Sequence, residues 1–207
     1  MALHEQQQRI YLASASPRRR ELLKQIGVHF EVLMLRTHPS RADVDETPNP
    51  AENPSEYALR IAHAKAETGH MALHMRRLPP YPVLAADTTV TIDGQIIGKP
   101  SDMAQAMEIL KRLSGQRHEV HTAIALAYGG DVKTKLCTSV VEFAPLDEQT
   151  IKNYALSGEP HDKAGAYAIQ GRAAAFISRL EGSYSGVMGL PLFETVQLLE
   201  QFGIDVL

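Results

Sequence analysis

The feature that most constrains the fold of this chain is the segment Ile10–Gly27, which reads IYLASASPRRRELLKQIG. Its apolar start, Ile10–Ala13, is typical of a buried strand. Pro17 fits the first position of a helix, where its missing N–H costs nothing. Apolar side chains then follow at helical spacing, and Gly27 is a suitable stop. The segment therefore predicts a strand, a hydroxyl-rich turn and the N-terminus of a helix in direct succession.

Three arginines, Arg18, Arg19 and Arg20, fall in the first turn of this predicted helix, where the positive end of the helix dipole repels cations. A bound anion resolves the conflict, because free backbone N–H groups, the hydroxyls of Ser14 and Ser16, and guanidinium groups all suit phosphate. We interpret the turn as a polyphosphate cradle. The alternative is a solvated basic turn that begins an ordinary surface helix.

The rest of the chain alternates further predicted strands and helices. Runs rich in apolar, branched and aromatic residues predict strands over 28–35, 82–91, 95–97, 119–128, 133–143 and 174–180. Helices are predicted from Ser55 to about 77, from Ser101 to 113, over 148–156 and over 192–202, with the two serines as caps; residues 182–189 are expected to be a turn region. Because hairpin turns such as Asp93–Gly94 occur beside longer crossovers, a mixed sheet is expected.

Composition and charge exclude several classes of protein. The hydrophobic content of 44% and charged content of 22% are those of a soluble globular chain. The net charge of −3 gives no attraction to a nucleic-acid polymer or an anionic membrane, so phosphate recognition must be local. Cys137, the single cysteine, excludes an intramolecular disulfide framework and suits a reducing compartment. Without a signal-peptide core or a bilayer-length apolar run, the protein is expected to be cytoplasmic.

Asp87 is the sharpest chemical signal in the sequence. It interrupts the strand-like run PVLAADTTVT, in which an unpaired carboxylate would be expensive to bury. We interpret Asp87 as a metal ligand or general base at a strand end, with Thr88 beside it as a second oxygen. The alternative is a structural aspartate that binds turn amides.

Two further candidates lie in loops. Glu46 belongs to the polar, proline-rich segment 37–54, whose length suggests either a functional flap or simple disorder. It would supply a second carboxylate for a hard cation such as Mg²⁺; otherwise it belongs to a solvated acidic loop. Lys99, between a glycine and a proline, is a candidate phosphate ligand, although lone lysines at loop ends are more often solvated.

The glycine-punctuated segment 161–171 carries two more candidates for substrate binding. The ammonium of Lys163, on a glycine-flanked backbone, is expected to reach a cleft, and the amide of Gln170 is suited to recognise a flat polar ring. His118 and His121 could share a metal site, although no third ligand is evident. The glycines form neither GxGxxG nor a P-loop, so a Rossmann or Walker-type enzyme is disfavoured.

Five segments, in the family's order, resemble the motifs of the Maf family of nucleoside triphosphate pyrophosphatases, which cut the bond between the α and β phosphates. They are SASPRRRELL (14–23), AADTTVTIDGQIIGKP (85–100), LSGQRHEVHTA (113–123), SGEPHDKAGAYAIQG (157–171) and GSYSGVMGLPL (182–192). The resemblance runs from about Ile10 to Leu199. Ala85 and Ala168 stand where glycine is usual in the family.

The resemblance implies an α/β fold of the Maf/ITPase-like type, with a central mixed, twisted sheet flanked by helices and a deep cleft between two lobes. It implies one domain over residues 1–207, built of two lobes around one cleft, with residues 1–8 as a flexible N-terminus. It also implies a divalent metal cation, Mg²⁺ or Mn²⁺, as cofactor and a nucleoside triphosphate as substrate. The family often forms homodimers, so a homodimer is expected.

The resemblance also implies the chemistry of individual positions. Asp87 matches the family's proton acceptor, and Glu46 matches an acidic position linked to metal. Together with the interpretation of Asp87 as a metal ligand or general base, this makes Glu46 and Asp87 the expected metal ligands. Ser14, Arg18 and Arg19 match the phosphate-binding motif S-x-S-P-R-R.

Other matched positions concern the cleft and the base. Lys65 and Lys99 match lysines of the cleft, whereas Arg18, Thr88 and Gln170 fall at positions associated with substrate choice.

Gln170 favours the branch of the family that acts on dTTP and UTP. Uracil and thymine present an N–H donor flanked by carbonyl acceptors, which a carboxamide complements and cytosine in part reverses. The related branch that acts on 7-methyl-GTP has glutamate at this position. That branch, and a nucleotide-sensing regulator of cell division without turnover, are the alternatives. Whether canonical or modified pyrimidine triphosphates are the physiological substrate stays open.

Overall fold

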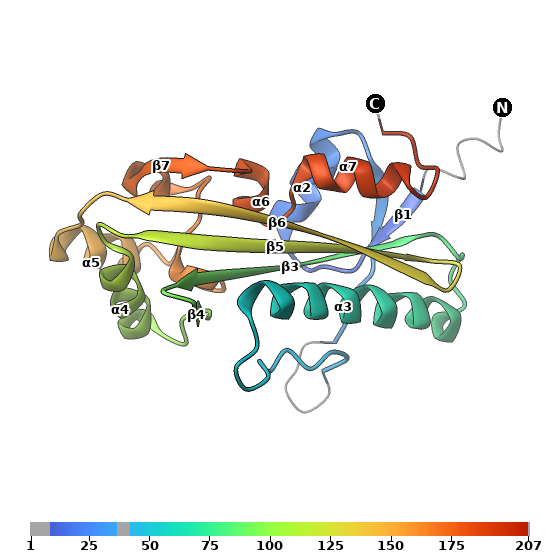
Figure 1. Ribbon diagram of the computed structural model, residues 1–207, viewed down its shortest axis with the longest axis horizontal. Coiled ribbons are helices and arrows are strands. Elements are labelled where there is room, and N and C mark those ends of the chain that lie inside the picture. Colours follow the sequence, from blue (N-terminus) through green and yellow to red (C-terminus); the bar gives the residue numbers. More distant parts are fainter. Residues whose placement is uncertain (1–8, 37–41, 207) are drawn as a thin grey trace.

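The computed structural model describes residues 9–36 and 42–206, which form one sheet with helices on both faces (Figure 1). The strands are β1 (Arg9–Leu12), β2 (His29–Val32), β3 (Val83–Ile92), β4 (Gln95–Ile97), β5 (Arg117–Tyr128), β6 (Asp131–Phe143) and β7 (Ile177–Glu181). The helices are α2 (Pro17–Gln25), α3 (Pro54–Arg76), α4 (Met103–Leu113), α5 (Glu148–Leu156), α6 (Tyr184–Met188) and α7 (Leu192–Glu200), with the 3-10 helices η2 (Ala164–Ala166) and η3 (Arg172–Phe176). The N-terminal eight residues lie outside the described part, as does the start of the predicted loop, 37–41.

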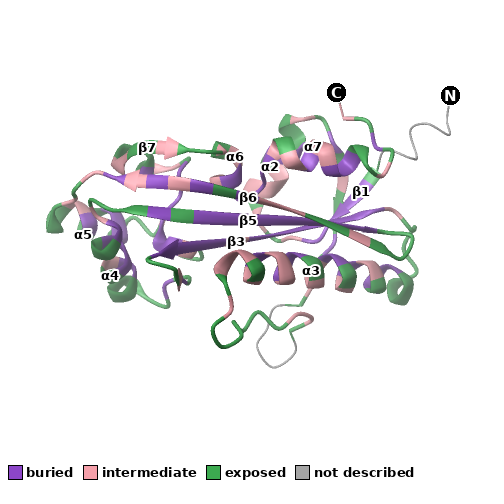
Figure 2. Cartoon of the chain, in the orientation of Figure 1, coloured by how far each residue is buried: buried purple, intermediate pink, exposed green. Residues whose placement is uncertain are grey.

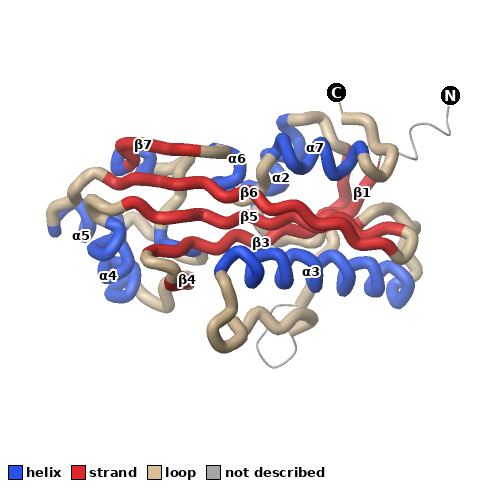
Figure 3. The backbone as a smooth tube through the Cα atoms, in the orientation of Figure 1, coloured by secondary structure: helices blue, strands red, loops and turns tan. Residues whose placement is uncertain are grey.

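The sheet is mixed, as the sequence predicted. Its strands follow the order β2-β1-β3-β5-β6-β7, and β4 pairs with β3 off this path. β1 runs parallel to both β2 and β3, whereas every other pair is antiparallel. In Figure 3 the long strands β3, β5 and β6 run the length of the molecule between groups of helices. The expected α/β class with a central mixed sheet is therefore confirmed.

α3 covers one face of the sheet at close range because small side chains line the contact. Ala62 and Ala66 are fully buried against alanines of β3 and β5. At Gly69 a Cβ would come within 2.8 Å of Val83 Cγ1, so only glycine leaves room for the sheet. Figure 2 shows the buried strands above α3 and the exposed residues on the helix's outer side. This close approach brings Lys65 of α3 against β3.

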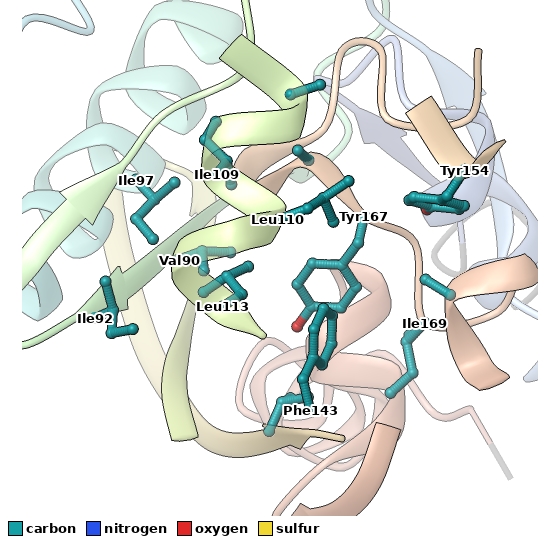
Figure 4. Packing of buried hydrophobic residues seen from close by; sticks show 14 of the residues in the cluster. Val90, Ile92, Ile97, Ile109, Leu110, Leu113, Phe143, Tyr154, Tyr167 and Ile169 are labelled. Carbon is teal, nitrogen blue, oxygen red and sulfur yellow. The ribbon is translucent and has the colours of Figure 1, made fainter. Parts of the chain in front are cut away.

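The other face of β3 contributes to two separate clusters of buried side chains. Leu84 and Ala86 belong to a cluster with α2 and α7, at the end of the sheet near β1. Val90 and Ile92 belong to a second cluster with α4, α5 and the segment that carries Tyr167 (Figure 4). The change from one cluster to the other falls at the middle of β3.

The same part of β3 lacks a partner strand on one edge. Residues Val83–Leu84 pair with β1, and Val90–Ile92 pair with β4 along that edge. Among the described strands, none pairs with residues 85–89 there. Because strand edges present unpaired backbone groups, this interval is open to contacts from other elements.

Two helix caps differ from the prediction. Asn53, not Ser55, caps α3, because Pro54 takes the first helical position and the residue before it accepts the Ser55 N–H at 2.9 Å. Asp102, not Ser101, caps α4 through its carboxylate.

The strand predicted over 174–180 is partly wrong, and the turn region 182–189 is more ordered than expected. η3 occupies 172–176, where the three alanines Ala173–Ala175 favour a helical turn, and the strand begins only at Ile177. Residues 184–188 form α6, because the Ser183 hydroxyl accepts the Gly186 N–H at 3.0 Å and so caps the helix.

Within the described ranges, every helix is too short or too polar to span a membrane.

Candidate active site

A cavity of about 600 Å³ opens where β3 lacks its edge partner. Its volume is typical of a site for a small molecule. All ten residues that the sequence proposes for the site line this cavity: Ser14, Arg18, Arg19, Glu46, Lys65, Asp87, Thr88, Lys99, Lys163 and Gln170. They come from six separate parts of the chain, and only the fold brings them together.

Asp87 lies in the middle of β3, not at a strand end as predicted, and it reaches the cavity because the strand edge is open. Its Oδ1 accepts a hydrogen bond from Lys65 Nζ at 2.8 Å, and its Oδ2 accepts one from Thr89 Oγ1 at 3.3 Å. Only 8% of Asp87 is exposed, so its carboxylate depends on these partners. Among the described residues no turn amide donates to it, which disfavours the structural alternative.

Glu46 places a second carboxylate on the same lysine. Its Oε1 lies 2.9 Å from Lys65 Nζ, so the ammonium bridges Glu46 and Asp87. Tyr57 holds the loop there, because its hydroxyl donates to the Glu46 carbonyl at 2.8 Å. Burial, reinforced by the charges of Asp87 and Glu46, raises the pKa of Tyr57 to about 12, so the hydroxyl stays a donor at neutral pH.

This pair of carboxylates fits a divalent cation. Both oxygen atoms converge on one point, at which the structure has the positive charge of Lys65. Mg²⁺ at a phosphate site takes one or two protein carboxylates and completes its shell with phosphate and water oxygens. Within the described chain no three acidic, histidine or cysteine side chains gather as a metal cage. Glu46 and Asp87 are therefore the residues that could hold such an ion.

Arg19 closes the open edge of β3. Its Nη1 donates to the Ala86 carbonyl at 2.8 Å and to Ser14 Oγ at 3.2 Å, and its Nη2 donates to Thr88 Oγ1 at 3.2 Å. Its Nε donates to the Gly189 carbonyl at 2.8 Å. Protein oxygens thus engage four of the five N–H groups of the guanidinium. Arg19 lines the cavity chiefly as a brace, with one N–H left for a ligand.

Positive charge gathers elsewhere in the cavity, in the first turn of α2 and at Lys163. Burial lowers the pKa of Arg18, and the charge of Glu21 offsets this in part. Burial also lowers the pKa of Lys163, and the positive charge of Arg18 adds to that effect. The Ser16 side chain makes no capping hydrogen bond within the described residues, so the first turn of α2 keeps unsatisfied N–H groups. Partly buried cations beside a helix N-terminus suit a polyphosphate.

Residues 164–172, which we name the base segment, form the far wall of the cavity. Gln170 is exposed at the cavity, whereas Tyr167 and its neighbours are buried. Gly165 and Ala166 both have positive φ, at 71° and 57°, and a Cβ on Gly165 would lie 3.0 Å from Val90. A backbone in this sparsely populated conformation persists only where its surroundings fix it.

Several contributors to the site were missed from the sequence. In the sequence, Tyr57 occupies an apolar position of a predicted helix. In the structure its hydroxyl fixes the loop that carries Glu46. Gly189, inside a segment predicted only as a turn, has φ of 115° and supplies the carbonyl that accepts from Arg19. Its place in the GSYSGVMGLPL motif is the one signal that could have revealed it.

His118 and His121 do not share a site, because they lie three residues apart on β5 and point to opposite faces of the sheet. His118 Nε2 lies 2.9 Å from the Tyr167 hydroxyl, whereas His121 contacts Thr91 and Thr138.

Comparison with known proteins identifies the family of the chain. Residues 9–202 match the family model described as "Maf: Maf-like protein". The chain is 58% identical over 198 residues to the dTTP/UTP pyrophosphatase of Nitrosomonas europaea, covering 95% of this chain and 96% of that protein. It is 57% identical over 199 residues to the dTTP/UTP pyrophosphatase of Aromatoleum aromaticum, covering 95% and 97%.

One solved structure, the Ham1 protein of Staphylococcus aureus, is similar at a TM-score of 0.46 and 21% identity, over 66% of this chain and 72% of that one, which is too weak a similarity to bear on function. The match to the family model, in contrast, spans nearly the whole chain. This protein therefore belongs to the Maf family.

Proposed function

We propose that this protein hydrolyses dTTP and UTP between the α and β phosphates, releasing the nucleoside monophosphate and pyrophosphate. The observation that carries the proposal is the arrangement of opposite charges in one cavity. Two carboxylates converge on one cation position, and the basic turn of α2 lines the same cavity. Relatives that are 57–58% identical over 95% of the chain are named dTTP/UTP pyrophosphatases, which supports the choice of substrate.

The phosphates are bound by the cationic side of the cavity. Arg18, Lys99 and Lys163 neutralise the tail, and the turn at Ser14 offers it a hydroxyl and backbone N–H groups. Arg19 contributes its remaining N–H while it holds Ser14 and Thr88 in place. Binding an anion relieves the repulsion between Arg18 and Lys163.

The reaction is centred on Asp87. A water oxygen attacks the α-phosphorus, the bond from that phosphorus to the bridging oxygen breaks, and pyrophosphate leaves. Asp87 accepts the proton from the water, as a general base within the cavity. A divalent cation, Mg²⁺ or Mn²⁺, held by Glu46 and Asp87, would neutralise phosphate charge and activate water. Lys65 keeps the two carboxylates aimed at one point when that cation is absent.

The base is selected at the far wall. The Gln170 carboxamide offers a donor and an acceptor to uracil or thymine, whose edge has both. Arg18 and Thr88, which the resemblance to the family associates with substrate choice, line the same cavity as Gln170. A cytosine in the same orientation leaves polar groups unpaired, which costs affinity.

The test is a parallel assay of pyrophosphate release from dTTP, UTP, dCTP and 7-methyl-GTP with Mg²⁺. We expect dTTP and UTP to be hydrolysed with the highest kcat/KM. Preference for 7-methyl-GTP would instead place the chain in that branch of the family. Tight dTTP binding without release of pyrophosphate would contradict catalysis and favour a nucleotide sensor. A reaction without divalent metal, in chelator, is the control for cofactor dependence.

The location, the form of the substrate and the oligomeric state are part of the same proposal. It acts on free nucleotides in the cytoplasm rather than on a nucleic-acid polymer, in keeping with its net charge of −3. Two lobes around the cavity form one domain, and two chains form a homodimer. Sedimentation of the full chain measures that state directly.

A further inference from the structure

Tyr154 and Glu159 stand behind the base segment rather than in the cavity. Tyr154 belongs to the last turn of α5, and Glu159 follows that helix. Neither side chain is among those that line the cavity within the described residues. Both nevertheless make hydrogen bonds to the backbone of the segment that carries Gln170.

The two side chains form one continuous chain of hydrogen bonds. The Ala168 N–H donates to the Tyr154 hydroxyl at 3.3 Å, and that hydroxyl donates to Glu159 Oε1 at 2.9 Å. The other oxygen, Glu159 Oε2, accepts the Arg172 N–H at 3.1 Å. The contacts therefore fix the backbone two residues before and two residues after Gln170. We name Tyr154 and Glu159 the clamp.

Packing holds the Tyr154 side of the clamp, whereas Glu159 is only partly buried. Tyr154 is only 3% exposed, and its ring meets the Phe176 ring edge-on at 5.1 Å between centroids. Burial, with the hydrogen bond to Glu159, raises the pKa of the Tyr154 hydroxyl, so it remains protonated and able to donate. A Cβ on Gly171 would overlap the Glu159 carboxylate, so glycine is the residue that lets the segment lie against the clamp.

We propose that Tyr154 and Glu159 are positioning residues that fix the orientation of Gln170 and thereby set which base the enzyme accepts. This inference rests on the proposed function, and it adds two specificity-determining side chains that do not touch the nucleotide. A carboxamide that turns over exchanges its donor and its acceptor, so it distinguishes uracil from cytosine only while it is held. The clamp fixes the backbone on both sides of Gln170, which limits the positions and directions from which its carboxamide can meet the base.

The experiment compares Tyr154→Phe and Glu159→Gln with the wild-type full chain, using kcat and KM for dTTP and dCTP. Tyr154→Phe keeps the ring and removes the hydroxyl, and Glu159→Gln keeps the size and changes the acceptors. Losing one hydrogen bond at a buried site corresponds to about tenfold. We expect the dTTP-to-dCTP ratio of kcat/KM to fall about tenfold, mainly through KM, with kcat for dTTP changed less than about threefold.

Tyr128→Phe is the matched control, because this tyrosine is 43% exposed at the β5–β6 turn. A double-mutant cycle with Gln170→Ala adds a readout that a general structural role would not give. If the clamp acts through Gln170, Tyr154→Phe lowers the ratio no further in the Gln170→Ala background.

An unchanged ratio in folded Tyr154→Phe and Glu159→Gln, or an equal fall in Tyr128→Phe, overturns the inference. Additive losses in the cycle also overturn it. If Tyr154→Phe does not fold, the Glu159→Gln ratio decides. If the wild-type chain releases no pyrophosphate from dTTP, the proposed function fails, and the clamp is then judged by the ratio of dTTP and dCTP dissociation constants measured by calorimetry.

Discussion

Two loops that line the cavity are each fixed by a tyrosine hydroxyl, but one of these contacts is exposed and the other is buried. In the flap, residues 42–53, the Tyr57 hydroxyl binds the backbone at Glu46. In the base segment, residues 164–172, the Tyr154 hydroxyl binds the backbone at Ala168. Each tyrosine comes from a neighbouring helix, so the helix positions the loop.

The surroundings of the two contacts differ. In the flap, Arg60 donates to the Thr47 carbonyl and forms a two-pronged ion pair with Glu52 at 2.6 and 2.7 Å, near the surface. In the base segment the hydrogen bond from Ala168 to Tyr154 is buried beside the Phe176 ring, whereas the bond from Arg172 to Glu159 is exposed. Exposed ion pairs add little stability, whereas buried hydrogen bonds are costly to break. We therefore expect the exposed contact of Tyr57 with the flap to break more easily than the buried contact of Tyr154 with the base segment.

The largest expected effect comes from neither loop but from β3, the strand that carries Asp87. Asp87→Asn removes the proposed proton acceptor and one of the two carboxylates, so we expect turnover of dTTP to fall at least ~10²-fold. Pyrophosphate release at saturating Mg²⁺ measures it. Asp93→Asn is the control, since Asp93 is exposed at the β3–β4 turn with φ of 52°, which asparagine also adopts. Near-normal turnover in Asp87→Asn would remove Asp87 from the mechanism.

The next effect is a loss of stability at low pH, and it concerns the base segment. Burial lowers the pKa of His118 to about 4, and its Nε2 lies 2.9 Å from the Tyr167 hydroxyl in the base segment. The unfolded chain binds this proton near pH 6.5, so stability is full above that pH and falls as the pH drops toward 4. We expect a loss of roughly 3 kcal/mol in the free energy of unfolding over this window.

Denaturant unfolding of wild type and His118→Gln between pH 7 and pH 4 measures this loss. The variant should be less stable at pH 7 and should show a flatter dependence on pH. An equally steep fall in the variant would assign the effect to other groups. The flap should persist in the same window, because the hydrogen bond from Arg60 lowers the pKa of Glu52 to about 2.

The smallest effect is expected in the flap itself. Arg60→Gln breaks the ion pair with Glu52 and weakens the contact to Thr47, which loosens the loop that carries Glu46. Because the pair is near the surface, we expect only about a threefold rise in the Mg²⁺ concentration for half-maximal activity. Arg117→Gln, which breaks a more exposed pair with Glu181 outside the flap, should leave it unchanged. A tenfold or larger rise would show that the flap is as firmly fixed as the base segment.

Much of the fold was predictable from local pattern. The strand, turn and helix of residues 10–27 appear as β1 and α2, and the helix over 148–156 is α5 with those bounds. The prediction of helix caps was wrong where two neighbouring polar residues could both serve as the cap, as at Asn53. The prediction of a strand was wrong where alanines favour a helical turn, as in η3. Eight of the ten candidate residues lie in the five motifs, the exceptions being Glu46 and Lys65, and all ten line one cavity.

The sequence by itself determined the residue types of the site, the mixed sheet and the membership of the family, because these depend on local periodicity and on motifs that remain readable along the chain. Only the tertiary structure decided how those residues act together. Because no described strand pairs with the middle of β3 on one edge, Asp87 is open to the cavity and the Ala86 carbonyl accepts a hydrogen bond from Arg19. The contacts of Tyr154 and Glu159 with the base segment likewise depend on where α5 packs. Such contacts join residues through geometry, and geometry is fixed only when the whole core has formed.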